Sequence, residues 1–286
     1  MKTELAQALD ESLASAGYEL LDHLHRSNGF DVYDAWSSER HSRVVIKTPR
    51  PDRLDDHVLL RRLEREGRLL YGLTHPHILR GYEMLPAPVP AIVTETLRGE
   101  TLSHLIRESN GLSAAETAVL GLQLSSAVGY LHGQGYLHLD LKPSNIVVDA
   151  GRAILIDLSI ARKPGPATPG LGTWSYLAPE QAVGRLLGPE ADVWGIGAVL
   201  FAALTARAPF GESEADESAD TDDPETYPQL TERAPLVASL LDLTASLAEV
   251  VDACLEPDPW RRPSVEELAA ALEAVPGAGS PRAARR

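Results

Sequence analysis

The sequence is poor in cysteine and has no long apolar run. Cys254 is the only cysteine among 286 residues, which excludes an intramolecular disulfide and a cluster of thiolate metal ligands. We interpret it as a small core residue. No run of about 18 uninterrupted apolar residues is present, so we expect no membrane-spanning helix. The N-terminal stretch contains acids and lacks the apolar segment of a secretory signal, and we therefore expect a cytoplasmic protein without a membrane partner.

Positive charge is also scarce. The formal net charge is −15, which argues against nucleic acid as a partner because phosphate backbones repel an acidic surface. Eight of the acids lie between Glu212 and Glu225, a stretch without a base, which we expect to be a low-complexity loop. Arginine supplies most of the positive charge, so each lysine indicates a position that needs a compact point charge. The lysines are Lys2, Lys47, Lys142 and Lys163.

The first half of the chain is typical of strands with one strong helix. Short segments rich in β-branched and aromatic residues alternate with polar turns. The charged segment 55–73 is predicted to be a helix, because its leucines at 59, 63 and 70 lie on one stripe. A helix at 4–16, ended by Gly17, would precede the first strand. The predicted strands are residues 18–24, 31–36, 43–47, 81–85 and 91–94.

The second half is predicted to be mostly helical. Residues 115–133 repeat apolar side chains at helical spacing, and 191–205 are apolar on nearly every face, which is typical of a buried central helix. Two short strands, 146–148 and 153–156, lie between them. Ser264 and Glu267 form a capping box that opens a last helix, running to about residue 275. The remainder, 276–286, is predicted to be a disordered basic tail.

The segment His138-Leu-Asp-Leu-Lys-Pro-Ser-Asn145 is the most informative one. Phosphoryl transfer needs a carboxylate to orient the attacking hydroxyl, cations to neutralise phosphate, and oxygen ligands for Mg²⁺. Asp140, Lys142 and Asn145 can supply these three. An apolar strand follows and ends in Asp157, a second oxygen ligand. A polar surface loop is the alternative interpretation, and the ordered run of these residues disfavours it.

This segment resembles the catalytic loop of serine/threonine protein kinases of the eukaryotic-like, bacterial type, and Asp157-Leu158-Ser159 stands where that family has Asp-Phe-Gly. Other segments resemble further motifs of the family in the same order along the chain. They are Val44-Val-Ile-Lys47, Gly172-Thr-Trp-Ser-Tyr-Leu-Ala-Pro-Glu-Gln181, Asp192-Val-Trp-Gly-Ile-Gly197 and Asp258-Pro-Trp-Arg-Arg-Pro263. The resemblance covers about residues 18 to 275.

The resemblance implies roles for individual residues. Lys47 would hold the α- and β-phosphates of ATP and pair with a glutamate of the helix at 55–73. Glu66 is the better candidate by its distance from His75-Pro76, whereas Glu64 would point to another face; a solvated helix charge is the alternative for Glu66. The remaining roles are Mg²⁺ ligation by Asn145 and Asp157, hydrogen bonding of Asp140 and Lys142 by Thr173, adenine contacts by Val32 and the hinge from Glu95 to Leu97, a gatekeeper at Thr94, and a buried pair between Glu180 and Arg262.

The sequence departs from the family pattern at three places. The glycine-rich loop before Lys47 would normally let backbone amides approach phosphate, but this chain has His25-Arg-Ser-Asn-Gly-Phe-Asp-Val32. Arg26 or Ser27 could contact phosphate instead. Asp-Leu-Ser replaces Asp-Phe-Gly, and Leu139 stands where an arginine usually precedes the catalytic aspartate. In the resembling kinases, such an arginine pairs with a phosphate on the activation segment, which here would be Asp157 to Glu180. We therefore expect basal activity without phosphorylation of that segment.

The implied fold is α+β with two lobes: a small antiparallel β lobe with one helix, at about 18–96, and a larger helical lobe at about 97–275 that contains the acidic loop 212–225. ATP would lie in the cleft between the lobes, and residues 1–17 would form a helical extension.

The function implied by the resemblance is transfer of the γ-phosphoryl group of Mg-ATP, with Mn²⁺ as an alternative metal, to Ser/Thr hydroxyls of protein substrates. A regulatory protein partner would supply any input signal. Two alternatives stay open at this point. The first is a pseudokinase that binds nucleotide as a scaffold, because the glycine-rich loop is degenerate. The second, disfavoured by the segment from Gly172 to Gln181, is a phosphotransferase for small molecules.

Overall fold

The computed structural model describes residues 2–27, 29–86, 90–211, 227–240 and 245–278. The chain divides into two compact units. The small unit comprises residues 1–98 with 157–159, and the large unit comprises residues 99–156 with 160–286. The acidic loop expected at 212–225 lies outside the described residues. No helix in the described ranges is long and apolar enough to cross a membrane.

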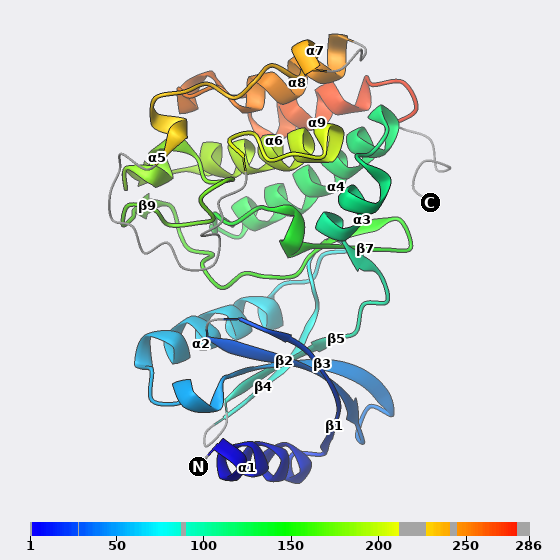
Figure 1. The fold of residues 1–286 in the computed structure, drawn as a ribbon, viewed down its shortest axis with the longest axis vertical. Helices are drawn as coiled ribbons and strands as arrows, with labels where there is room; N and C mark the ends of the chain where they lie inside the picture. The colour runs from blue at the N-terminus through cyan, green and yellow to red at the C-terminus, as the bar shows by residue number, and fades with distance from the viewer. Residues whose placement is uncertain (1, 28, 87–89, 212–226, 241–244, 279–286) are drawn as a thin grey trace. The chain divides into compact units, whose positions relative to one another are not determined.

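The small unit is built on one five-stranded antiparallel sheet (Figure 1). Its order is β1-β2-β3-β5-β4, and β2 and β3 are paired so that Val32 lies opposite Lys47. Successive side chains of a strand point to opposite faces, so Lys47 and Ile46 belong to different faces of this sheet. The strands are β1 (Tyr18–Arg26), β2 (Phe30–Ser37), β3 (Ser42–Pro49), β4 (Gly81–Leu85) and β5 (Ala91–Glu95).

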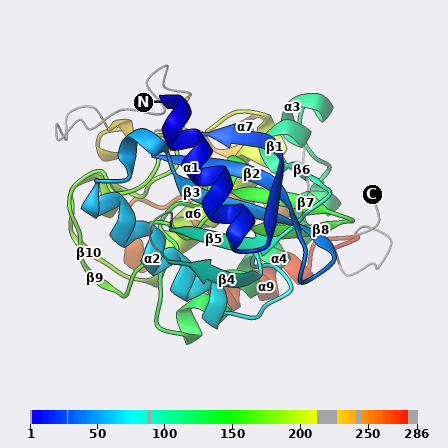
Figure 2. The ribbon, with the colours of Figure 1, turned by 90° about the horizontal axis from the view of Figure 1, so that it is seen from below.

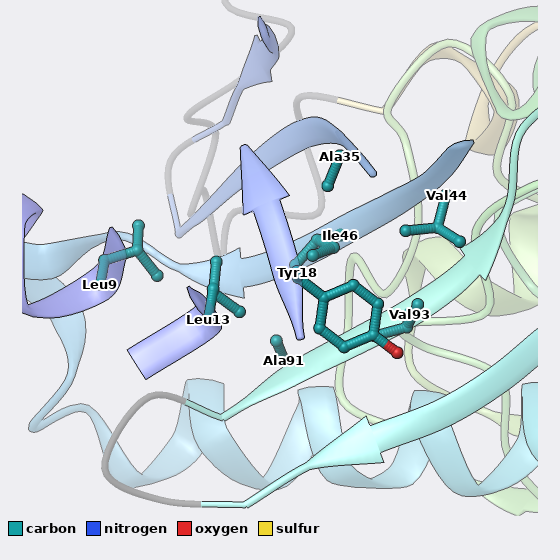
Figure 3. Close-up of a cluster of buried hydrophobic side chains, with 8 residues drawn as sticks. All are labelled: Leu9, Leu13, Tyr18, Ala35, Val44, Ile46, Ala91 and Val93. Carbon is teal, nitrogen blue, oxygen red and sulfur yellow. The ribbon is translucent and has the colours of Figure 1, made fainter. Parts of the chain in front are cut away.

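A helix packs on the Ile46 face of the sheet. This helix, α1 (Lys2–Ser15), lies across the strands (Figure 2). Its Leu9 and Leu13 are buried, at 4% and 1% exposure. Figure 3 shows both side chains directed towards the sheet, where they join one apolar cluster. The other members of the cluster are Tyr18, Ala35, Val44, Ile46, Ala91 and Val93. Hydrophobic packing therefore crosses the boundary that the sequence suggested at residue 17.

The second helix of the small unit, α2 (His57–Gly72), begins at a capped N-terminus. The side chain of Asp56 accepts hydrogen bonds from the backbone N–H groups of Val58 and Leu59, at 3.0 and 3.1 Å, and so satisfies two donors that have no partner inside the helix. The leucine stripe expected from the sequence faces inward, with Leu63 and Leu70 each 1% exposed. Glu66 lies on the same buried side.

The large unit is mainly helical (Figure 1). At its centre lies α6 (Pro189–Thr205), in which every residue from Ala191 to Leu204 is buried, as its apolar sequence predicts. A three-stranded sheet of order β6-β7-β8 carries the segment that precedes Asp157. Its strands are β6 (Glu100–Thr101), β7 (Ile146–Asp149) and β8 (Arg152–Leu155), and β9 (Gly165–Pro166) pairs with β10 (Leu186–Leu187). The other helices are α3 (Leu102–Ser109), α4 (Ala114–Gly133), α5 (Pro179–Ala182), α7 (Val237–Leu240), α8 (Ala245–Cys254) and α9 (Val265–Glu273).

The predicted fold class is confirmed: one unit holds a small antiparallel sheet and the other is helical. Two details differ from the sequence prediction. The last helix, α9, ends at Glu273, and the chain continues in a turn. The prediction of disorder from residue 276 is wrong for the first three residues, because Ala278 is buried at 6% exposure and packs as part of the core. Cys254 is fully buried, and burial raises the pKa of its thiol to about 12, as expected of a core residue.

Candidate active site

In the small unit, Lys47 and Glu66 form a buried ion pair. The Lys47 Nζ lies 2.9 and 2.8 Å from the two carboxylate oxygens of Glu66, whose side chain is 1% exposed. Lys47 reaches this partner because β3 directs it to the face that α2 covers. Glu64, the other candidate, instead pairs with Arg68 one helical turn away and is half exposed.

Asp157 adds a second carboxylate beside Lys47. Its Oδ1 is 3.6 Å from the Lys47 Nζ and accepts a hydrogen bond of 2.8 Å from the backbone N–H of Ser159. The carbonyl of Ser159 in turn accepts from the Arg65 guanidinium of α2 at 2.7 Å. The segment Asp157-Leu158-Ser159 is thus tied to the small unit although strand β8 of the large unit leads into it.

The three charges of this cluster shift one another's protonation equilibria. Burial alone would lower the pKa of Lys47, but the carboxylates of Asp157 and Glu66 outweigh burial and raise it above the usual value for lysine. Burial raises the pKa of Glu66 to about 7, and the adjacent Lys47 ammonium opposes this shift. Lys47 is therefore permanently cationic near neutral pH, while Glu66 titrates there.

In the large unit, three polar side chains of the loop between α4 and β7 bond to one another or to Thr173, which lies after β8. The hydroxyl of Thr173 donates to Oδ1 of Asp140 at 2.6 Å and accepts from Nζ of Lys142 at 2.7 Å. The side-chain amide of Asn145 donates to Oδ2 and to the backbone carbonyl of Asp140, both at 2.9 Å. Both carboxylate oxygens of Asp140 are held in place, so the carboxylate has one defined orientation.

Asp192, at the start of α6, anchors the backbone of this loop. Its carboxylate accepts from the backbone N–H groups of His138 and Leu139, at 2.8 and 2.7 Å, and contacts His132 Nε2 at 2.8 Å. Asp192 is 1% exposed, and a buried carboxylate requires such partners. Sequence reasoning identified Asp192 only as the first letter of a motif and missed this role. An acid that opens an otherwise apolar helix was the available signal.

A second buried pair stabilises the large unit. The guanidinium of Arg262 makes two hydrogen bonds with the Glu180 carboxylate, at 2.6 and 2.9 Å, and lies 4.9 Å from the centre of the Trp194 ring. Both ionic side chains are almost fully buried. The pair joins α5 to the segment before α9, which are far apart in the sequence, and so holds the end of the segment that carries Thr173.

Comparison with known proteins agrees with this chemistry. The protein kinase domain family matches residues 18–271. This chain belongs to the protein kinase family. The serine/threonine-protein kinase PkaA of Streptomyces coelicolor is 32% identical over 250 residues, which are 81% of this chain and 43% of the relative.

Two further relatives carry the same description. The serine/threonine-protein kinase PrkC of Bacillus subtilis is 33% identical over 207 residues, covering 70% of this chain and 32% of the relative. The serine/threonine-protein kinase PknB of Mycobacterium leprae is 31% identical over 205 residues, covering 68% and 33%. The chain spans less than half the length of these relatives. The resemblance to bacterial kinases of the eukaryotic-like type is thereby confirmed.

The kinase departs from its family where β1 meets β2. The guanidinium of Arg26 is engaged by the Asp31 carboxylate at 2.7 and 2.9 Å, and the hydroxyl of Ser27 bonds the backbone of Phe30. Both side chains that sequence reasoning offered as phosphate contacts are thus engaged within the hairpin. The ring of Phe30 lies 4.9 Å from the Lys47 Nζ, which is within the range of a cation–π contact.

The other residues expected to bind nucleotide lie on the sheet and on the segment that follows it. Val32 is paired with Lys47 across β2 and β3, so both share one face. Thr94 is buried in β5, and its hydroxyl donates to the carbonyl of Val45 at 3.4 Å. Glu95 closes β5, with its backbone N–H bonded to the Arg80 carbonyl at 3.0 Å. Leu97 follows and is half-buried.

Proposed function

We propose that this kinase transfers the γ-phosphoryl group of ATP to serine and threonine hydroxyls of proteins. The observation that carries the proposal is the hydroxyl of Thr173, which donates to Asp140 and accepts from Lys142. A single hydrogen-bonded unit thereby joins a carboxylate that can orient an attacking hydroxyl and an ammonium that can meet phosphate charge. The descriptions of the bacterial relatives support the same reaction.

Within the large unit, Asp140 is the group that would receive the proton of the substrate hydroxyl. Hydrogen bonds from Thr173 and Asn145 hold one rotamer of its carboxylate, so little reorganisation accompanies the reaction. Lys142 would neutralise negative charge that moves from the γ-phosphate towards the leaving group. Its ammonium is fixed by Thr173 and lies 3.6 Å from Asp140.

Within the small unit, Lys47 would bind the α- and β-phosphates. A lysine held by two carboxylates carries its charge at any physiological pH, and Glu66 holds the ammonium without occupying all of its three donors. Adenine would contact the face of the sheet that carries Val32 and the backbone from Glu95 to Leu97. Thr94 would stand behind it as gatekeeper.

Each unit offers an oxygen donor that suits a hard divalent cation, Asp157 in the small unit and Asn145 in the large unit. Asp157 offers carboxylate oxygen, and both hydrogen bonds of the Asn145 amide use its nitrogen, which leaves its carbonyl oxygen as the ligand atom. Oxygen donors of this kind favour Mg²⁺ and also accept Mn²⁺. The cation would neutralise phosphate charge, and we propose Mg²⁺ as the physiological metal with Mn²⁺ as a substitute.

Partners and location follow from the reaction. The substrates are proteins with a serine or threonine acceptor, and a regulatory protein is proposed as the source of input. Nucleic acid is disfavoured by the net charge of −15. Since the reaction consumes ATP, we place it in the cytoplasm.

The test is a radiolabelled-ATP assay of the purified chain with a generic basic protein substrate, run in parallel with Mg²⁺ and with Mn²⁺. Lys47→Met and Asp140→Asn should each reduce transfer at least about 1,000-fold, because each removes a charge that acts in the transition state. Lys163→Met and Asp149→Asn serve as matched controls on exposed or half-exposed positions and should keep wild-type turnover. Near-wild-type rates in either active-site variant would refute the assignment.

A further inference from the structure

Gln181, in the short helix α5, uses every polar atom of its side chain in the protein interior. It is 2% exposed. Its Oε1 accepts from the backbone N–H of Ala178 at 3.0 Å. Its Nε2 donates to the carbonyl of Leu139 at 2.9 Å and to the carbonyl of Leu171 at 2.6 Å. Both amide hydrogens are therefore directed at backbone carbonyls from two different segments.

These two segments are the ones that bring Thr173 to Asp140. Leu139 directly precedes Asp140, and Leu171 lies two residues before Thr173. The amide of Gln181 thus forms a further connection between the catalytic loop and the activation segment, beside the Thr173 hydroxyl, which bonds both Asp140 and Lys142. Connections at separate points constrain both the distance and the relative orientation of the segments, whereas the Thr173 hydroxyl holds them at a single point.

The backbone at Leu139 needs this support. Its φ is 67°, in the left-handed region that a residue with a side chain seldom occupies. Asp192 holds the N–H of Leu139 at 2.7 Å, and Gln181 holds its carbonyl at 2.9 Å. The peptide groups before and after Leu139 are thereby fixed. The orientation of the second peptide group determines the direction in which the side chain of Asp140 points.

Gly172 provides independent support. It has φ of 131°, and a Cβ placed on it would lie 2.9 Å from the Gln181 Nε2 and 3.0 Å from the Leu139 carbonyl oxygen. A side chain here would push the amide away from Leu139. The glycine therefore leaves the space that the contact between Gln181 and the catalytic loop requires.

We propose that Gln181 is a positioning residue, which keeps the activation segment in register with the catalytic loop through a neutral amide. The proposal rests on the proposed kinase function and assigns to that site a device for its regulation. The side chain beside the catalytic aspartate is that of Leu139, which is apolar and 3% exposed and offers no charge to a phosphate. The neutral, buried amide of Gln181 holds the two segments together without a phosphorylated residue.

The chain contains a matched control. Gln229 is also 2% exposed, and its amide donates to the carbonyls of Trp174 and Leu177, at 2.6 and 3.3 Å. It holds the same segment, but within the part of the chain that the structure describes it makes no hydrogen bond to the catalytic loop. Replacing either glutamine by methionine keeps the volume and removes the hydrogen bonds, so the pair separates loss of positioning from general loss of packing.

The experiment measures steady-state kinetics and melting temperature for Gln181→Met and Gln229→Met. We expect kcat to fall at least tenfold in Gln181→Met with KM for ATP changed less than twofold, because the nucleotide contacts assigned to the small unit are untouched. Gln229→Met should lose a similar amount of melting temperature and keep kcat within about twofold. Equal kcat in the wild type and Gln181→Met, or an equal loss in both variants, would overturn the proposal.

Two further measurements keep the result decisive. Gly172→Ala retains Gln181 but displaces its amide, so it should reproduce the kcat loss if Gln181→Met fails to fold. Limited trypsin digestion, with cleavage after Arg162 and Arg185 identified by mass, should proceed faster in Gln181→Met than in Gln229→Met. An inactive wild type with this difference in cleavage would refute the proposed function and keep the positioning role, whereas equal cleavage rates would refute the positioning role itself.

Discussion

At the scale of single residues, the active site depends on where charges are buried. Glu66 and Lys47 meet in the small unit at 2.8 Å, and neither would be tolerated there alone. The carboxylate of Asp140 is instead held in one orientation, by hydrogen bonds to both of its oxygens. One carboxylate has its pKa raised by burial, and the other is oriented by its neighbours.

The pKa of Glu66 leads to a prediction about pH. Burial raises it to about 7, so Glu66 is ionised above this pH and loses its charge below it. Protonation would release Lys47 from its partner and weaken nucleotide binding. We expect kcat/KM for ATP, divided by the value for Glu66→Gln, to fall about tenfold between pH 8 and pH 6.

The ratio cancels titration of ATP itself, which affects both proteins alike. A ratio that does not change with pH would show that Glu66 keeps one protonation state throughout. The same raised pKa affects folding with the opposite sign: the folded protein binds a proton more tightly than the unfolded chain, so the contribution of Glu66 to stability is largest at low pH and is lost as pH rises to about 7.

Phe30 supplies a second prediction at this scale. Its ring lies 4.9 Å from the ammonium of Lys47, on the face of the sheet where phosphates would bind, and we expect the ring to move when Lys47 contacts them. A cation–π contact of this kind contributes about 0.5–1 kcal/mol, so Phe30→Ala should bind Mg-ATP about two- to fivefold more tightly by calorimetry. Phe30→Tyr keeps the ring and should bind as the wild type does. Weaker binding in Phe30→Ala would mean that the ring helps to hold nucleotide.

At the scale of elements, α1 is part of the small unit and not an appendage. Leu13 is 1% exposed and packs in the cluster with Ile46 and Val93. Its truncation should leave a cavity on the face of the sheet opposite Lys47. We expect Leu13→Ala to lower the free energy of unfolding by about 2–4 kcal/mol in urea.

The control for this truncation is Leu24→Ala on β1, where the side chain is 52% exposed. It should change stability by less than about 0.5 kcal/mol. If Leu13→Ala were as mild as Leu24→Ala, α1 would contribute no packing energy to the sheet.

The activation segment is the other element whose behaviour can be predicted. Leu139 cannot bind a phosphate, and the amide of Gln181 already joins the segment to the catalytic loop. Thr168 and Thr173 are the threonines of this segment, and Thr173 is bonded to the catalytic loop. We therefore expect phosphatase-treated Thr168→Ala to keep its initial rate within about threefold of the untreated wild type. A loss above about tenfold, or 1.4 kcal/mol of barrier, would reveal a phosphate switch. Arg162 and Lys163 would then be its receivers, although Arg162 is engaged with the carbonyl of Pro166 at 2.9 Å.

At the scale of the whole molecule, charge is distributed unevenly. Eight of the acids lie between Glu212 and Glu225, and the formal net charge is −15. These residues lie outside the described structure, so the prediction about them comes from the sequence. Deleting 212–225 should leave the melting temperature within about 2 °C, since a low-complexity segment adds little to a core, and should raise KM for a basic protein substrate at low ionic strength.

Added salt provides the control for this deletion. At about 0.5 M salt the Debye length is only a few ångströms, and the difference in KM between the two proteins should disappear. An unchanged KM at low ionic strength would mean that the acidic stretch does not attract substrate.

Much of this protein could be predicted from short segments. The family motifs are local runs such as Asp140-Leu-Lys142, and the buried helix α6 is visible as a continuous apolar stretch. Fold class and family follow from such runs because hydrophobic periodicity and motif spacing are properties of neighbouring residues. The order of strands in the sheet was not predicted, since no local signal specifies which strands pair.

The sequence alone determined which chemical groups are available and in what order they occur. Tertiary structure decided which of them meet. Glu66 and Glu64 are two residues apart and chemically identical, and only the burial of one face of α2 separates a partner of Lys47 from a surface charge. Gln181 is an ordinary polar residue in the sequence. It becomes the connection between two segments because the chain folds back until its amide lies beside the carbonyls of Leu139 and Leu171, and such distant approaches depend on packing of the whole unit and not on any local pattern.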